Sequence, residues 1–182
     1  MKINRFLHVN NTDSAPARGQ PGFDPLLKIR NIIDHLPVLF GSCLKPQREL
    51  SVDEAMIPFR GRLNFKQYVP AKPTKWGIKV WMLCESQSGY CLDFDIYTGR
   101  YTEVSENGLG YDVVRELTLP YQNRHYHIYF DRFFTSPLIV AELLPNHTYA
   151  CGTVMLHRKG LPAEVKKRKV HKNAMINYQK ED

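Results

Sequence analysis

The order of strand-like and helix-like patterns between residues 49 and 155 limits this chain to few folds. Three strand-like runs, rich in β-branched and aromatic residues, come first, and helical and strand-like runs then alternate. The expected elements are strands at 49–58, 76–86 and 90–99, a helix at 110–118, a strand at 125–130, a helix at 136–144 and a strand at 148–155. Three hairpin-linked strands followed by alternating helices and strands predict an α/β fold built on a mixed sheet.

A further helix is expected before the first strand, after a polar loop at 10–22 that is rich in Pro and Gly. Asp24 is a natural N-cap, and Pro25 suits the first helical position. Apolar residues at helical spacing follow, namely Leu26, Leu27, Ile29, Ile32, Ile33 and Leu36. Pro37 should end or kink this helix, because its ring removes a backbone donor.

Two local patterns describe the later elements. The run 90–99 alternates one set of side chains, Cys91, Asp93, Asp95 and Tyr97, with another, Leu92, Phe94 and Ile96. This alternation predicts a strand with one solvent-facing side and one buried side. Helix 136–144 should begin with Ser136 as N-cap and Pro137 in its first turn.

The composition indicates one folded unit with an acidic partner. Of the 182 residues, 43% are hydrophobic and 12% aromatic, which is enough for a buried core. The formal net charge of +7 favours nucleic acid as the partner. The chain shows neither a signal-peptide pattern nor an apolar run near 18 residues, so we expect a soluble protein with no membrane association. The four cysteines are interpreted as reduced and mostly buried, as in intracellular proteins.

Two aspartates occupy positions typical of a metal site in an α/β sheet. Asp53 lies within the first strand, and Asp131 directly follows the fourth, where ligands of open α/β sheets bind. If these strands are neighbours, the two carboxylates repel one another unless a divalent cation such as Mg²⁺ lies between them. Such an ion binds phosphate oxygens and prepares a water or hydroxyl for attack. The alternatives are a salt-bridged surface hairpin around Asp53 and Glu54, and a turn capped by Asp131.

Residues 60–79, called here the basic segment, contain six cations and no acid: Arg60, Arg62, Lys66, Lys72, Lys75 and Lys79. Four aromatic residues precede or interrupt these cations: Phe59, Phe65, Tyr68 and Trp76. Cations neutralise phosphates, and aromatic faces stack on unpaired bases, so this pattern is typical of a DNA-binding surface. The alternative is a solvated β-hairpin whose aromatic side chains face the core.

Two other features have weaker implications. The run "KKRKV" at 166–170 is typical of a nuclear-import signal or a phosphate-binding tail. His125 and His127 should share one face of the fourth strand. Without a Cys or His partner at metal spacing they make a poor zinc site, so we interpret them as structural or solvent-facing.

Longer stretches of the sequence resemble the catalytic domain of piggyBac-type transposases. The resemblance lies in "LSVDEAMIPFRGRLNFKQYVPAKPTKWGIKVWMLCESQSGYCLDFDIYTG" and in "YFDRFFTSPLIVAELLPNHTYACGTVMLHRKGLP". The segment "MKINRFLHVNN…FDPLLKIRNIIDHL" is similar to the helical region that precedes that domain. The element order is also that of ribonuclease-H-like domains, so the resemblance covers nearly the whole chain and implies this fold.

The resemblance implies a nuclear DNA transposase that cuts and rejoins DNA at TTAA targets with three aspartates and a divalent metal, Mg²⁺ or Mn²⁺. Asp53 and Asp131 match the first and second aspartates, and the basic segment would lie near the DNA. The chain then divides into an N-terminal loop and helical segment (1–47), part of a ribonuclease-H-like catalytic domain (48–156) and a basic tail at the start of an insertion (157–182).

The sequence departs from the family pattern at the third aspartate, which belongs to a later segment; Asp93 and Asp95 do not match it. We therefore expect a truncated and inactive copy that associates with itself through an uncovered apolar face. The alternatives are a non-catalytic, domesticated module for DNA binding or protein interaction, and a product without a selected role.

Overall fold

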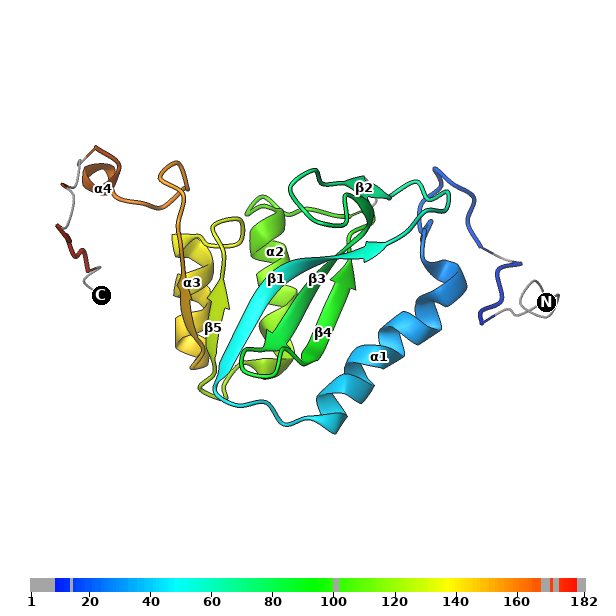
Figure 1. Cartoon of the computed structure of the whole chain (residues 1–182), viewed down its shortest axis with the longest axis horizontal. Helices are drawn as coiled ribbons and strands as arrows, with labels where there is room; N and C mark the ends of the chain where they lie inside the picture. The colour runs from blue at the N-terminus through cyan, green and yellow to red at the C-terminus, as the bar shows by residue number, and fades with distance from the viewer. Residues whose placement is uncertain (1–8, 14, 100–101, 168–170, 172–173, 180–182) are drawn as a thin grey trace.

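The fold is built on one mixed sheet of six strands (Figure 1). The structure is a computed structural model, and it describes residues 9–13, 15–99, 102–167, 171 and 174–179. The strands are β1 (Glu49–Pro58), β2 (Gln67–Tyr68), β3 (Trp76–Glu85), β4 (Cys91–Ile96), β5 (His127–Phe130) and β6 (Tyr149–Gly152). The helices are α1 (Arg30–Cys43), α2 (Leu109–Thr118), α3 (Pro137–Leu143) and α4 (Ala163–Lys167), with short 3₁₀ turns at Leu27–Ile29, Leu119–Tyr121 and Leu144–Asn146.

The sheet has an antiparallel half and a parallel half. β3 pairs antiparallel with both β1 and β4, which gives the expected meander. β1 pairs in parallel with β5, and β5 pairs in parallel with β6. The expectation that the first and fourth strands are neighbours is therefore confirmed. The two-residue strand β2, which pairs with the start of β3, was not expected, because two residues carry no periodicity.

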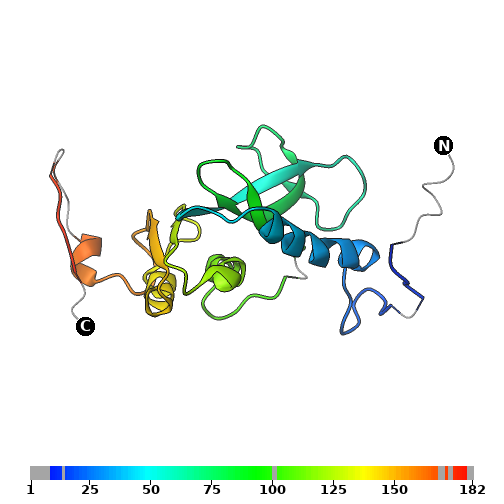
Figure 2. The ribbon, with the colours of Figure 1, turned by 90° about the horizontal axis from the view of Figure 1, so that it is seen from below.

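The hydrophobic core lies between the sheet and the helices α2 and α3, which cover the same face (Figure 2). The sheet contributes Leu50, Val52, Leu83 and Ile128, and the helices contribute Val113, Val114, Leu117, Ile139 and Leu143. Each such side chain stabilises the fold by about 1.5–3 kcal/mol when it leaves water. The expected start of α3 is confirmed, because the Ser136 hydroxyl accepts a hydrogen bond from the Ile139 backbone amide at 3.3 Å.

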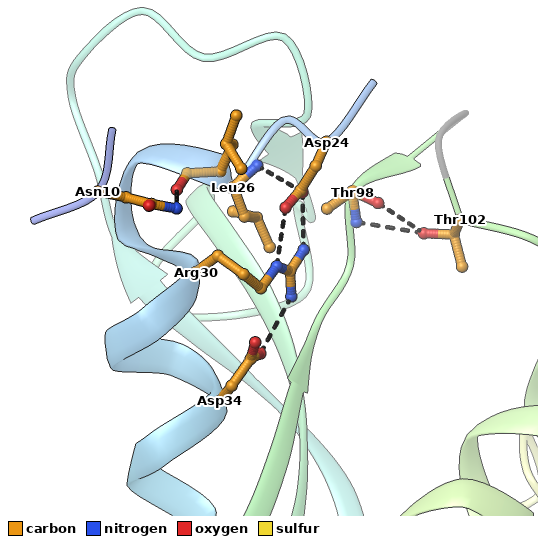
Figure 3. Close-up of polar contacts among 8 residues, drawn as sticks. Asn10, Asp24, Leu26, Arg30, Asp34, Thr98 and Thr102 are labelled. Carbon is orange, nitrogen blue, oxygen red and sulfur yellow. Dashed lines mark hydrogen bonds and ion pairs between the residues drawn. The ribbon is translucent and has the colours of Figure 1, made fainter. Parts of the chain in front are cut away.

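Helix α1 differs from the expectation at its beginning, and it does not end at Pro37. A 3₁₀ turn comes first, so Asp24 is not the N-cap; its carboxylate accepts from the Leu26 amide and pairs with Arg30 at 2.7 Å (Figure 3). Pro37 lies inside the helix, which continues to Cys43. Tertiary packing of the second half, where the Phe40 ring contacts β4, holds the helix across the missing backbone bond.

Strand β4 does not have the expected solvent-facing side. Asp93 and Asp95 are half-buried, and burial raises the pKa of both carboxyl groups. Helices α1 and α2 both lie against β4, and Arg30 at the start of α1 and Glu116 of α2 interact electrostatically with Asp95. The sequence pattern could not reveal this, because the residues of α1 and α2 that lie against β4 are separated from it along the chain.

Several smaller expectations need correction. β5 begins at His127, so His125 lies in the preceding loop with a positive φ of 59° and does not share a strand face with His127. The cysteines are not mostly buried: Cys43 and Cys151 are exposed, and the other two are half-buried. Most of "KKRKV", at 168–170, and the first eight residues lie outside the described residues. Among the described residues no helix has both the length and the apolar character needed to cross a membrane.

Candidate active site and basic surface

Asp53 and Asp131 directly follow the last residue pair between the neighbouring parallel strands β1 and β5, with Asp53 inside β1 and Asp131 just after β5. The last pair in the β1–β5 register is Val52 and Phe130, and each aspartate is the next residue after its member of this pair. Neighbouring strands lie about 4.8 Å apart, a separation that one or two ions can bridge. Because side chains alternate along β1, the Asp53 carboxylate projects from the face opposite the buried Val52.

The two aspartates line one open cavity of about 450 Å³. Its other lining residues are Ser51, Val52, Tyr129, Phe130, Cys151, Gly152 and Thr153. Sequence reasoning missed the residues from the end of β6, which join the site because β6 runs parallel to β5. The sequence did contain a signal for these residues, namely the expected strand at 148–155. If that strand runs parallel to the strand at 125–130, its carboxyl end lies beside Asp131.

Backbone amides orient both carboxylates. The Glu54 amide donates to Asp53 Oδ1 at 2.8 Å, and the Phe133 amide donates to Asp131 Oδ1 at 2.7 Å. The bond from the Phe133 amide shows that Asp131 also caps the turn after β5, which was the alternative role considered for it. It occupies one carboxylate oxygen, and no hydrogen bond within the described residues involves Oδ2 of either aspartate. Each side chain therefore keeps an oxygen that a ligand can reach.

The main chain of Asp131 is also held firmly. Its carbonyl accepts from the Phe134 and Thr135 amides at 3.2 and 3.1 Å and from the Thr135 hydroxyl at 2.6 Å. Thr135 is buried, so water does not compete for this bond. The turn after β5 thus positions Asp131 on a rigid support.

Lys72 of the basic segment lies beside the two aspartates. Its Nζ is 3.0 Å from Glu54 Oε1, and the bond to Glu54 raises the pKa of Lys72; Asp53 and Asp131 raise it further through their charges. The ion pair of this region therefore joins Glu54 to a distant lysine. Among the described residues neither Arg60 nor Arg62 forms the salt-bridged hairpin considered as an alternative.

The other cations of the basic segment differ in exposure. Arg60, Arg62 and Lys75 are exposed. Lys66 Nζ lies 5.3 Å from the centre of the Trp76 ring, and Lys79 Nζ lies between two rings, 5.8 Å from that of Trp81 and 5.2 Å from that of Phe133. The segment is thus a mixed surface, with free cations on its loops and ring-bound lysines near the sheet.

An aromatic pair stands at the outer edge of this surface. The Tyr68 and Trp76 rings lie 4.7 Å apart and are 51% and 55% exposed. Phe65, in contrast, is buried, so the alternative in which the aromatic residues face the core holds for this side chain. The exposed pair offers flat faces to solvent.

The donor set of the cavity suits a hard divalent cation. Two carboxylates with free oxygens bind Mg²⁺ or Mn²⁺ together with water and phosphate oxygens. The described residues contain no group of three His, Cys, Asp or Glu side chains that could hold a metal ion. The site within these residues is therefore a two-carboxylate site that needs ligands from water or substrate.

Comparisons with known proteins identify the family of the chain. The sequence model of the family described as Transposase IS4 matches residues 1–182. The human PiggyBac transposable element-derived proteins 3 and 2 are both 30% identical, over 85% and 90% of this chain and 27% and 28% of their own lengths. The chain thus spans less than a third of these curated relatives.

A solved structure is similar over most of the chain. A cryo-EM structure of a piggyBac transposase synaptic complex with hairpin DNA matches with a TM-score of 0.74 and 32% identity, over 82% of this chain and 32% of that one. The expected ribonuclease-H-like mixed sheet is confirmed by this similarity. The chain therefore belongs to the Transposase IS4 family and is related to the piggyBac-type transposases.

Proposed function

We propose that this chain binds DNA as part of a piggyBac-type transposase catalytic core and holds a divalent ion, Mg²⁺ or Mn²⁺, between Asp53 and Asp131. The observation that carries the proposal is the position of these aspartates on neighbouring parallel strands, in one cavity, with free carboxylate oxygens. By family, the DNA would be a TTAA-type target and the site of action the nucleus.

Each group has a physical role in this proposal. Asp53 and Asp131 bind the cation, which when present neutralises phosphate charge and activates the attacking oxygen. The exposed Arg60, Arg62 and Lys75 attract the DNA backbone. Lys66, Lys72 and Lys79 add positive charge nearer the sheet. The exposed Tyr68–Trp76 pair provides a surface on which an unpaired base stacks.

The 182-residue chain is proposed to bind DNA without cutting it. Two carboxylates leave a divalent ion incompletely held, and no third acidic ligand joins them among the described residues. This favours the non-catalytic alternative, a DNA-binding module. Nicking of a TTAA-flanked hairpin DNA in Mg²⁺, lost in Asp53→Asn, would instead establish catalysis.

Mn²⁺ binding tests the proposed metal site directly. Electron paramagnetic resonance should detect Mn²⁺ bound to the chain, and Asp53→Asn or Asp131→Asn should weaken binding at least about tenfold, because each removes a charged ligand. Glu106→Gln, which removes an exposed carboxylate away from the cavity, is the matched control. Equal Mn²⁺ affinity in all four proteins would refute the site.

Self-association is proposed from the exposed apolar surface of α1. Val38, Leu39 and Ile32 are 68%, 43% and 44% exposed on this helix. Large exposed apolar patches mark interaction surfaces. Sedimentation velocity should show association that increases with protein concentration and weakens in Val38→Lys; a monomer at every concentration would contradict this.

A further inference from the structure

A second charged site lies at the end of the sheet opposite Asp53 and Asp131. It is a cavity of about 720 Å³ where α1 ends and β1 and β5 begin, at the lower end of the sheet in Figure 1. Its lining includes four basic side chains, Lys45, Arg48, Arg124 and His125. We call it the basic cavity.

The β1–β5 pairing brings these basic residues together. Glu49 lies opposite His127, and the His127 amide donates to the Arg48 carbonyl at 2.8 Å, so Arg48 is fixed next to the loop that carries Arg124 and His125. The His125 amide donates to the His147 carbonyl at 3.0 Å, which ties the same loop to the segment before β6. Backbone hydrogen bonds therefore hold the segments that carry Arg48, Arg124 and His125 in place.

The positive charge of the basic cavity is unbalanced. No carboxylate lines it, and no ion pair among the described residues involves Lys45, Arg48 or Arg124. Glu85 lines the neighbouring cavity with Lys45, but its carboxylate accepts bonds from Ser88. Cations held close together repel one another, so an anion that enters here lowers the electrostatic free energy.

The remaining walls favour an anion that also offers hydrogen-bond acceptors. Tyr121 and Tyr126 are each 7% exposed and line the cavity with their rings 6.2 Å apart. Burial is the main cause that raises the pKa of Tyr121 to about 12, so its hydroxyl remains a donor at neutral pH. Arg, Lys, Tyr and His donors around one space match the several oxygens of a phosphate.

We propose that the basic cavity binds a backbone phosphate of the same DNA that reaches the aspartates. This inference rests on the proposed DNA binding and adds a second contact to it. Arg48 precedes Asp53 by five residues on an extended strand, a separation of about 17 Å. Phosphates along one DNA strand are spaced by about 3.4 Å of helix axis, so a duplex that follows β1 spans both ends within about five base pairs.

The salt dependence of DNA binding tests the inference. Fluorescence anisotropy with a labelled duplex gives the slope of log K against log salt, which falls in magnitude by about 0.9 for each phosphate contact removed. Arg48→Gln with Arg124→Gln should lower the slope by nearly twice this amount. Lys28→Gln is the control for the loss of one positive charge away from the cavity, because Lys28 is exposed and separated from Gly41 at the cavity by about 20 Å of helix.

A variant without charge change tests the space itself. An added Cβ at Gly41 meets only the Tyr121 hydroxyl, at 3.4 Å, so Gly41→Leu should fold and fill part of the basic cavity. It should weaken DNA binding at low salt although the net charge is unchanged. Circular dichroism melts of each variant verify that the fold is intact.

The outcomes separate this inference from the proposed function. If Lys66→Gln with Lys75→Gln lowers the salt slope and the Arg48 and Arg124 changes do not, DNA binding stands and the second contact is refuted. If the parent chain binds no DNA but inorganic phosphate shifts the Tyr121 and His125 NMR signals, the cavity takes free phosphate, and both DNA proposals are refuted. A smaller salt slope both in Arg48→Gln with Arg124→Gln and in Lys66→Gln with Lys75→Gln supports the proposed DNA binding and the second contact.

Discussion

The two ends of the central sheet carry opposite charge for the same structural reason. At one end Asp53 and Asp131 come directly after the last β1–β5 residue pair, Val52 and Phe130, and at the other end Arg48 and the Arg124 loop precede the first pair. Parallel strands in register place their carboxyl ends together and their amino ends together. One pairing therefore creates both an acidic cavity suited to a cation and a basic cavity suited to an anion.

The ends also differ in how much change they tolerate. Around Asp131 the backbone is crowded: Phe130, Thr135 and Gly152 lie in close contact. The cations of the basic cavity are exposed side chains that lie after the end of a helix and on one loop. We expect the acidic end to respond to mutation through the fold, and the basic end to respond through binding.

The largest predicted difference concerns a pair of glycine substitutions. In Gly152→Ala the new Cβ would lie 2.4 Å from the Phe130 carbonyl oxygen, so the strands must shift, and unfolding in urea should show a loss of about 1–3 kcal/mol. In Gly41→Ala the nearest atom is 3.4 Å away, and better helix propensity should add about 0.5–1 kcal/mol. Equal effects of the two changes would show that the two ends are equally tolerant.

The sequence predicted the residues at one end of the sheet better than those at the other. Periodicity located β1, β3 and β5, and a mixed sheet allowed β1 and β5 to be neighbours, which their parallel pairing then showed. From this the proximity of Asp53 and Asp131 followed. The same reasoning applied to the residues before each strand would have placed Arg48 near His125, but those residues carry no motif that draws attention to them.

The features that sequence reasoning missed depend on contacts between distant segments. Pro37 remains inside α1 because Phe40 packs on β4, and Asp95 is half-buried because α1 and α2 both lie against β4. Lys72 pairs with Glu54 across eighteen positions of the chain. Local patterns describe how a segment prefers to fold, whereas burial and ion pairing are set by what lies next to it in space.

The second prediction uses ligands to compare the ends. Mn²⁺ at ten times its dissociation constant should stabilise the chain by about 1.4 kcal/mol, and phosphate at the same multiple should do so equally. Asp53→Asn should remove the Mn²⁺ effect on Tm and keep the phosphate effect, and Arg124→Gln should do the reverse. Thermal melts at fixed ionic strength measure both. A single variant that removes both effects would show that the two ends form one coupled site.

The smallest predicted effect concerns carboxylates away from both ends. Burial, followed by the charge of Asp93, raises the pKa of Asp95, whereas Arg30 lowers it; Glu116 faces Asp95 from α2. The folded state thus binds this proton more tightly than the unfolded state, whose pKa is near 3.9. Stability should decrease as pH rises from that value through the raised pKa.

Asp95→Asn should therefore raise Tm slightly at pH 7. It should leave Tm unchanged well below about pH 3.9, where the Asp95 carboxyl group is protonated in both the folded and the unfolded state. Asp34→Asn is the control, because this exposed carboxylate belongs to the ion pair with Arg30 and lacks the burial. A higher Tm for Asp95→Asn at both pH values would mean that packing, and not charge, sets the effect. A half-buried carboxylate without a cation at hydrogen-bond distance would then cost this fold little.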